Sequence, residues 1–242
     1  MLAIWRFSYS TAVLLLALQV TACAKYKVWV GVDSLAAPEA SIKKRFVLFP
    51  GNKGVSPDDL QFREFAAYIE RALTARGFSL VPIQEADIAI FVSYGVGNPE
   101  HHEYTKNIPI YGQTGISSAT TSGTVSTFGN MGSRYSATTT YTPTYGITGY
   151  QAQTHRYTTY TRFLFLQAYD LARYRTEGQQ VQVWTTAGIS TGSSDDLRDI
   201  FPYLAASLQP YIAENTGKRT QVVVDDLDQR VIEIRGEQKV SP

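Results

Sequence analysis

Residues 111–150 constrain the fold most, because this stretch cannot build a hydrophobic core. Of its 40 residues, 29 are Gly, Ser, Thr or Tyr, and Arg134 is its single charge. Such low-complexity composition is typical of mobile loops, although Thr and Tyr also favour strands. The pattern P-x-Y-G-x-T-G occurs at 109–115 and again at 143–149. This repeated turn chemistry predicts two equivalent bends with a hairpin-like arm between them. An ordered arm and a flexible polar insertion over 96–155 both stay open.

The flanking segments carry the apolar patterns of a core. Alternating or continuous apolar runs predict strands at 24–32, 46–49, 78–82, 88–94, 157–169 and 181–186, with a closing hairpin at 222–224 and 231–234. The run at 163–166 is apolar on both faces, which is typical of a strand buried on both sides.

Two helices are predicted by their caps and by apolar residues at helical spacing. Ser56 is a good N-cap for the first helix, and Gly77 ends it. Ser194 caps the second, which Gly217 ends and which two internal prolines would kink or divide. The patterns together predict the α+β or α/β class: one mixed, largely antiparallel sheet with two main helices and a long Thr/Ser/Gly/Tyr-rich insertion.

The N-terminus is typical of an export signal. Arg6 precedes the short apolar run 12–18, and the small residues of 20–22 lead to Cys23. The tetrapeptide VTAC resembles the lipobox of bacterial lipoproteins, which implies a lipid on Cys23 as the first residue of the mature chain. An uncleaved anchor helix over 2–22 is the alternative, but too few apolar residues remain for a span of ~20 residues. We therefore expect a signal peptide at 1–22 and a single domain at 23–242.

Cysteine and charge counts narrow the function further. Cys23 is the only cysteine, so no internal disulfide can form, and lipidation would consume its thiol. Of the 22 Lys and Arg residues only Arg6 lies in 1–22, which leaves 21 basic against 21 acidic residues. A neutral chain has no basic excess for phosphates, so we expect no nucleic-acid partner.

The pattern G-x-S-x-G at 188–192 raises the question of a serine nucleophile. A strand precedes Ser190 and a helix start follows it, as in a nucleophile elbow. However, His101, His102 and His155 all precede Ser190, and the hydrolase order needs a histidine after it. We expect the glycines to form a tight turn and the following serines to cap a helix, with no catalytic residue. A serine hydrolase using Ser190 is the alternative.

Other polar groups have plain structural explanations. The loop 51–54 lacks a phosphate-binding pattern, and the histidine pair at 101–102 lacks a second fixed ligand cluster. The aspartates at 225, 226 and 228 suit a turn, and those at 195, 196 and 199 suit a helix start. We therefore expect neither a metal nor a cofactor.

The tyrosines of the insertion offer a surface. They are interleaved with Thr, Ser, Asn and Gln, and they are Tyr104, Tyr111, Tyr135, Tyr141, Tyr145, Tyr150, Tyr157 and Tyr160. Flat rings with hydroxyl-rich neighbours suit stacking on glycan or contact with peptide. An ordinary strand surface, with the rings covering the sheet, is the competing interpretation.

Residues 44–95 and 156–217 resemble a family of bacterial envelope lipoproteins known as a domain of unknown function (DUF4136-like). The resemblance is carried by "RFVLFPG", "EADIAIFVSYG", "VQVWTTAG" and "DLRDIFPYLAASLQPYI". It implies an envelope α/β domain and supplies no catalytic residues. By resemblance to the lipoprotein sorting rule, Ala24 after the cysteine implies delivery to the outer membrane.

The sequence thus predicts a non-enzymatic protein held by a lipid at Cys23 on the periplasmic face of the outer membrane. We expect it to be a binding or assembly module with the 96–155 arm as its contact surface. Its partners would be another envelope protein or further copies of itself, with strand-edge pairing as one route. A peptidoglycan- or glycan-binding lipoprotein is the alternative.

Overall fold

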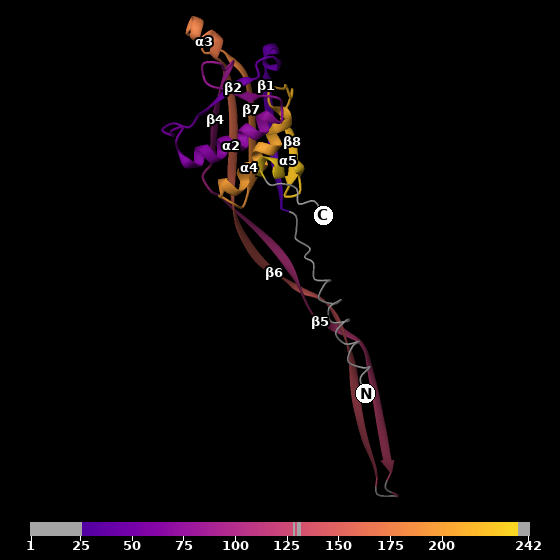
Figure 1. Cartoon of the computed structure of the whole chain (residues 1–242). Coiled ribbons are helices and arrows are strands. Elements are labelled where there is room, and N and C mark those ends of the chain that lie inside the picture. Colours follow the sequence, from indigo (N-terminus) through magenta and orange to yellow (C-terminus); the bar gives the residue numbers. More distant parts are fainter. Residues whose placement is uncertain (1–25, 128, 130–131, 237–242) are drawn as a thin grey trace, which may run out of the picture. The chain divides into compact units, whose positions relative to one another are not determined.

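The computed structural model describes residues 26–127, 129 and 132–236, so the expected signal peptide and Cys23 lie outside it. The strands are β1 (Lys27–Ala36), β2 (Arg45–Pro50), β3 (Ser79–Leu80), β4 (Ile88–Val96), β5 (Glu100–Thr127), β6 (Ser133–Asp170), β7 (Gln182–Gly192) and β8 (Thr220–Asp225) (Figure 1). The helices are α2 (Leu60–Thr74), α3 (Leu171–Glu177), α4 (Leu197–Leu208) and α5 (Gln229–Arg235), with 3-10 turns η1 (Pro38–Ser41) and η3 (Gln209–Tyr211).

The chain is mainly β, which corrects the predicted fold class. Strands take up 53% of the described structure and helices 24%, so the predicted α+β or α/β class with two main helices was wrong. The insertion is the main reason, because it forms most of the two longest strands, β5 and β6. Runs of Thr, Ser and Tyr satisfied their backbone groups by pairing with each other rather than by staying in loops.

The described chain divides into two compact units. The first contains residues 26–98 and 160–236, and the second contains Pro99–Thr159. Strand β6 contributes to both, because its residues before Tyr160 belong to the second unit. Each unit is described by itself below.

The first unit is a mixed sheet with the strand order β3-β2-β4-β6-β7-β1-β8. Strand β2 pairs in parallel with β3 and β4, and the other neighbours are antiparallel. Helix α2 lies between β2 and β3, which explains how these short segments can run in parallel. The hairpin expected at 222–224 and 231–234 was wrong in its second half. Residues 231–234 lie in α5, where Val231 and Ile234 share one buried helical face.

Helices α2, α4 and α5 cover one face of this sheet and form the core with it. The Phe65 ring stacks on Phe201 at 3.9 Å between centroids and meets Tyr94 edge-on at 4.8 Å. These rings join α2, α4 and β4 in one apolar cluster. Nine residues of α4 are buried, including Pro202, and the helix continues through it although we expected a kink or a break there. Pro210 lies in η3, just beyond the end of α4.

The helix starts differ from those predicted by a few residues. Asp59 rather than Ser56 caps α2, and its carboxylate accepts from the Phe62 backbone at 2.9 Å. Asp196 rather than Ser194 caps α4, accepting from two backbone N–H groups. In both cases the serine makes a smaller turn just upstream, accepting from the backbone N–H two residues later. An aspartate carries a full charge at the positive end of the helix dipole, which favours it as the cap.

The second unit is a two-stranded antiparallel ribbon of β5 and β6. Its register runs from Glu100 opposite Thr159 to Thr127 opposite Ser133. In this structure the insertion therefore forms a paired β-arm, whose register shifts at three places. The expected bends do not form, because both P-x-Y-G-x-T-G motifs lie inside the ladder.

Candidate interaction surface

The two P-x-Y-G-x-T-G motifs face each other across the ribbon. Gly112 of the first motif lies opposite Gly146 of the second, so the fourth residue of each copy meets its equivalent. A β-carbon on Gly112 would lie 3.0 Å from the Thr148 side chain, and one on Gly146 would lie 3.2 Å from Thr114. The absence of side chains at this glycine pair leaves room for the two threonines.

Each motif threonine is the extra residue of a β-bulge. Thr114 and Thr148 have no partner in the ladder register. The Thr148 hydroxyl donates to the Ile110 carbonyl at 3.2 Å, and the Thr114 hydroxyl donates to the Thr144 carbonyl at 3.3 Å. Both acceptors are the second residue of the opposite motif, so the contacts are related by a local two-fold symmetry. A third bulge lies at Ser117, whose hydroxyl donates to the Thr142 carbonyl at 3.1 Å.

The three bulges keep the large apolar side chains on one face. Tyr111 and Ile116 are five residues apart, an odd spacing that would place them on opposite faces of a regular strand. Because Thr114 is left out of the ladder, Tyr111 and Ile116 are four ladder positions apart, an even spacing that places them on the same face. The bulges at 148 and 117 do the same for the pairs Ile147–Tyr150 and Ile116–Val125. Sequence reasoning missed this arrangement, although odd apolar spacings beside a G-x-T signal are visible in the sequence.

The resulting surfaces have different chemistry. The tyrosine face, as we call it, presents the exposed side chains of Tyr111, Ile116, Val125, Tyr135, Tyr141, Tyr145, Ile147 and Tyr150. Tyr145 and Tyr111 are 74% and 71% exposed. The opposite side, the threonine face, carries Ser, Thr and Gly between residues 112 and 146 apart from Arg134. The structure adds geometry to the tyrosine hypothesis, because all five tyrosines of residues 111–150 share one face.

The section of the ribbon near residues 100 and 159 is charged and aromatic instead. His102 stacks on Tyr157, and Tyr104 stacks on His155. His101 and His102 also hydrogen-bond threonine hydroxyls across the ladder. The side chains of all three histidines are thus engaged in the ribbon. Within the described residues no group of three or more His, Cys, Asp or Glu side chains is placed to hold a metal ion.

Ser190 is a strand residue rather than an elbow. It lies inside β7, is only 2% exposed, and accepts a hydrogen bond from Arg162 Nη2 at 3.0 Å. The expected tight turn is wrong, because both flanking glycines belong to the strand and make space. A β-carbon at Gly188 would lie 2.4 Å from the Leu208 side chain, and one at Gly192 would lie 2.8 Å from the Arg162 guanidinium.

Arg162 is a buried cation that the sequence did not single out. It is 2% exposed, and its second donated bond goes to the Ser194 carbonyl at 2.8 Å. Its Nε has no partner, and no carboxylate among the described residues pairs with it. Burial lowers the pKa of this guanidinium. A hydroxyl that accepts from a buried cation is fixed in place and satisfies one of its donors, which is a structural role.

The remaining polar candidates also hold the fold together. In the 51–54 loop, the Asn52 amide both donates to and accepts from the Tyr94 backbone, at 2.7 and 2.9 Å. Asp228 caps α5 and pairs with Arg230, and Asp225 accepts from the Leu227 backbone. Asp226 accepts from the Tyr203 hydroxyl.

The face of the first sheet opposite the helices forms a second candidate surface. The 163–166 run was expected to be buried on both sides, but Phe163 and Phe165 are half-buried and stack on each other at 5.1 Å. Trp29 on β1 is 54% exposed and lies opposite Val223 on β8. These side chains share the uncovered face because alternate residues of neighbouring strands point the same way.

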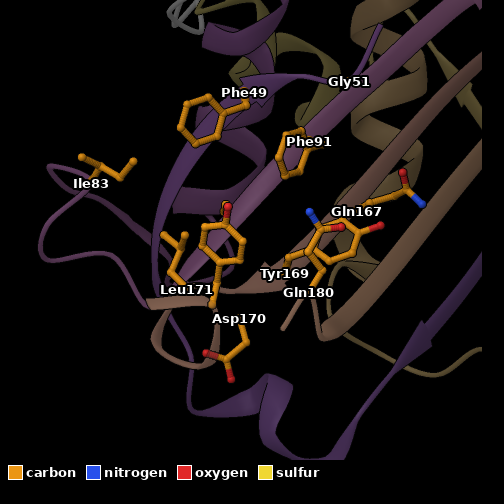
Figure 2. A pocket seen from close by; sticks show the side chains of 11 residues that line it. Phe49, Gly51, Ile83, Phe91, Gln167, Tyr169, Asp170, Leu171 and Gln180 are labelled. Atoms are coloured by element: carbon orange, nitrogen blue, oxygen red, sulfur yellow. The ribbon is translucent and has the colours of Figure 1, made fainter. Parts of the chain in front are cut away.

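One pocket of about 500 Å³ opens on this face. Phe49, Phe91 and Tyr169 come from three neighbouring strands and line it (Figure 2). Phe91 packs against both of the other rings at 5.7 Å. Asp170 also contributes, but its carboxylate already accepts from Lys43 and from the Arg173 backbone. Burial opposes ionisation of Asp170, and the Lys43 and backbone bonds overcome it, so the pKa is lowered.

Within the part of the chain that the structure describes, no helix is long and apolar enough to cross a membrane.

Comparison with known proteins does not assign the chain to a family. No protein-family model matches it, and no curated protein does. Three chains of solved structures match it. One is a PDZ-domain protein from Parabacteroides distasonis, at 11% identity and a TM-score of 0.38. The match covers 83% of this chain and 39% of that chain. Such a distant match assigns neither fold nor function here, and the lipoprotein-family resemblance stays a prediction.

Proposed function

We propose that this chain is a non-enzymatic binding or assembly module whose contact surface is the tyrosine face of the ribbon. The observation that carries the proposal is the set of three bulges. Each bulge interrupts the ladder and leaves one residue unpaired, which is unfavourable for an isolated ribbon. Together they gather exposed aromatic and branched side chains on one side, and exposed apolar patches of this kind mark interaction sites.

The side chains of the tyrosine face suit a contact surface chemically. Tyrosine supplies a large flat area and a hydroxyl, and it loses little conformational entropy when it is fixed. Between the charged section near residue 100 and Arg134, no ionisable group other than tyrosine interrupts this face. A partner therefore meets rings and aliphatic side chains without having to desolvate a charge.

The N-terminal sequence pattern supports a cellular location for this module. We propose that a lipid on Cys23 holds the mature chain on the periplasmic face of the outer membrane, as the lipobox resemblance implies. Intact mass spectrometry should find a chain that begins with acylated Cys23, and Cys23→Ser should release the protein from the membrane fraction. A soluble wild-type chain that begins elsewhere contradicts this proposal.

Photo-crosslinking in cells tests the contact surface directly. A benzophenone amino acid at Tyr145 lies on the tyrosine face, whereas the same probe at Thr142 lies on the threonine face. We expect Tyr145 to give a discrete adduct and Thr142 to give much less. If neither position yields an adduct, the tyrosine face is not a contact surface and the proposal is wrong.

Binding to peptidoglycan is the second candidate, because exposed rings beside hydroxyls suit sugar stacking. The triple variant Tyr111→Ser, Tyr145→Ser and Tyr150→Ser should then pellet less with purified sacculi than the wild type. The matched triple variant Thr120→Ala, Ser122→Ala and Thr140→Ala changes the threonine face and should pellet normally. Equal pelleting of all three proteins rules out glycan binding by this face.

A further inference from the structure

The ribbon has two free edges along its length. Among the described residues, β5 pairs only with β6, and β6 up to Thr159 pairs only with β5. Each strand therefore presents a row of backbone N–H and C=O groups on its outer side. Long unpaired edges are templates for the addition of further strands, and proteins normally blunt them with charges, prolines or short length.

These protections are sparse in the outer part of the ribbon. Residues 107–127 and 135–154 contain no Asp, Glu, Lys, Arg or His. Pro109 and Pro143 each remove one donor, which leaves 110–127 on β5 and 144–154 on β6 without a proline. At a rise of ~3.4 Å per residue, the β5 run alone offers an edge of ~60 Å.

We propose that these edges pair with the ribbons of further copies of this chain, the β5 edge of one copy against the β6 edge of the next. The inference rests on the proposed function, because it names the partner of the ribbon. In this arrangement neighbouring ribbons point the same way. Strand β5 of one copy then runs antiparallel to β6 of its neighbour, which repeats the pairing within each ribbon.

A second copy fits these edges because β5 and β6 already pair with each other along the whole ribbon. At each bulge the extra residue of one strand, Thr114 or Ser117 on β5 and Thr148 on β6, lies against a regular stretch of the other strand. Strand β6 of the next copy offers β5 the same order of regular and bulged stretches at the same heights, so the tyrosine faces of adjacent copies form one continuous surface. A strand of another sequence would have to reproduce this register to keep its apolar side chains on the tyrosine face. The lack of charge in these segments also means that adjacent copies do not repel each other.

Head-to-tail pairing leaves one free edge at each end of a row, so it continues to further copies until the arrangement closes or stops. Each added copy covers one β5 edge and one β6 edge. The proposal therefore predicts oligomers that depend on the ribbon.

Cysteine crosslinking between copies tests the pairing. One full-length population carries Thr121→Cys on β5, and a differently tagged one carries Thr139→Cys on β6. Thr121 and Thr139 lie opposite each other within one ribbon, so matching ribbons side by side at equal height would bring the same pair together between copies. With one introduced cysteine per chain, no disulfide can form within a ribbon. Repeats with Ala137→Cys and Tyr141→Cys cover a shift of two residues either way.

Thr138→Cys is the matched control, because residue 138 points to the threonine face. Disulfides need Cα atoms within ~7 Å and suitably directed side chains, so a mixed disulfide should exceed this control by about tenfold at one of the three positions. Mixed disulfides no stronger than the control at all three positions overturn the proposal. Thr121→Cys alone crosslinking as strongly as the mixtures also overturns it, because β5 would then face β5.

The Tyr145 adduct separates this inference from the proposed function. An adduct of two copies of the chain supports both. An adduct only with another envelope component keeps the proposed function and overturns pairing between copies.

Discussion

Replacing Ser190 by alanine separates a structural hydroxyl from a nucleophile. The hydroxyl is one of two acceptors for the buried Arg162 guanidinium, at 3.0 Å. A hydrogen bond to a charged group contributes about 1.5–3 kcal/mol, and its loss here leaves a buried donor unsatisfied. We therefore expect Ser190→Ala to lower the free energy of unfolding by about 2 kcal/mol. For a chain of this size that corresponds to a fall in Tm of about 4–8 °C.

A double-mutant cycle assigns that loss to the pair. Arg162→Met removes the guanidinium but keeps much of the apolar volume, so Ser190→Ala should cost almost nothing in that background. The four proteins are compared by urea denaturation, and the coupling free energy should be about 2 kcal/mol. Ser193→Ala is the neighbouring control at an exposed residue and should change stability by less than about 0.5 kcal/mol.

The outcome decides between the two roles. A serine hydrolase predicts that Ser190→Ala abolishes turnover of an activated ester while the melting curve stays unchanged. An unchanged melt together with a coupling below about 0.5 kcal/mol would refute the structural argument.

Three further predictions address the core, an ionisable side chain and the ribbon. Phe201→Ala should lower the free energy of unfolding by about 3–5 kcal/mol, because the ring stacks in the core. Phe163→Ala, on the uncovered sheet face, should lower it by about 1 kcal/mol in the same chemical denaturation experiment. Equal losses would mean that this face is covered. Burial, helped by the hydrogen bond to Asp226, raises the pKa of Tyr203 to about 12. That stabilisation is complete below pH ~10 and is lost as the pH rises through 12, so Tyr203→Phe should remove about 2–3 kcal/mol of the fall in stability measured between pH 9 and 12, and an unchanged fall would contradict this. Deletion of Thr148 should abolish the Tyr145 photo-adduct by turning residues 133–147 over relative to the rest of β6, and Thr148→Ser should keep it; an adduct that survives the deletion would show that the bulge does not set the face.

Local patterns in the sequence predicted the elements of the first unit best where apolar residues recur at helical spacing. The helix over 60–74 followed from Phe62, Phe65, Ile69 and Leu73 at helical spacing. The strand predicted at 231–234 was wrong. Its β-branched residues suggested a strand, but Asp228 caps a helix that contains them. A valine and an isoleucine three residues apart, here Val231 and Ile234, can belong to either a strand or a helix, and packing on the core decided between the two.

The candidate surface was predictable in composition but not in geometry. The sequence shows the tyrosines, the glycines and the repeated motif. It does not show that the motifs meet, because Gly112 and Gly146 are 34 positions apart and only strand pairing brings them together. The sequence did not identify Arg162 as buried for a related reason. Its side chain fits because Gly192, on the neighbouring strand, has no side chain, and only strand pairing brings the two residues together.

The sequence by itself determined which segments are able to build a core, that a pattern typical of an export signal precedes the only cysteine, and that residues 23–242 carry equal numbers of basic and acidic side chains. These are local or additive properties of residues. Only the tertiary structure decided that the polar stretch forms a ribbon, that its bulges collect the rings on one side, and that Ser190 serves a buried cation. Each of these depends on register between distant strands, and a shift of one residue in that register exchanges the two faces.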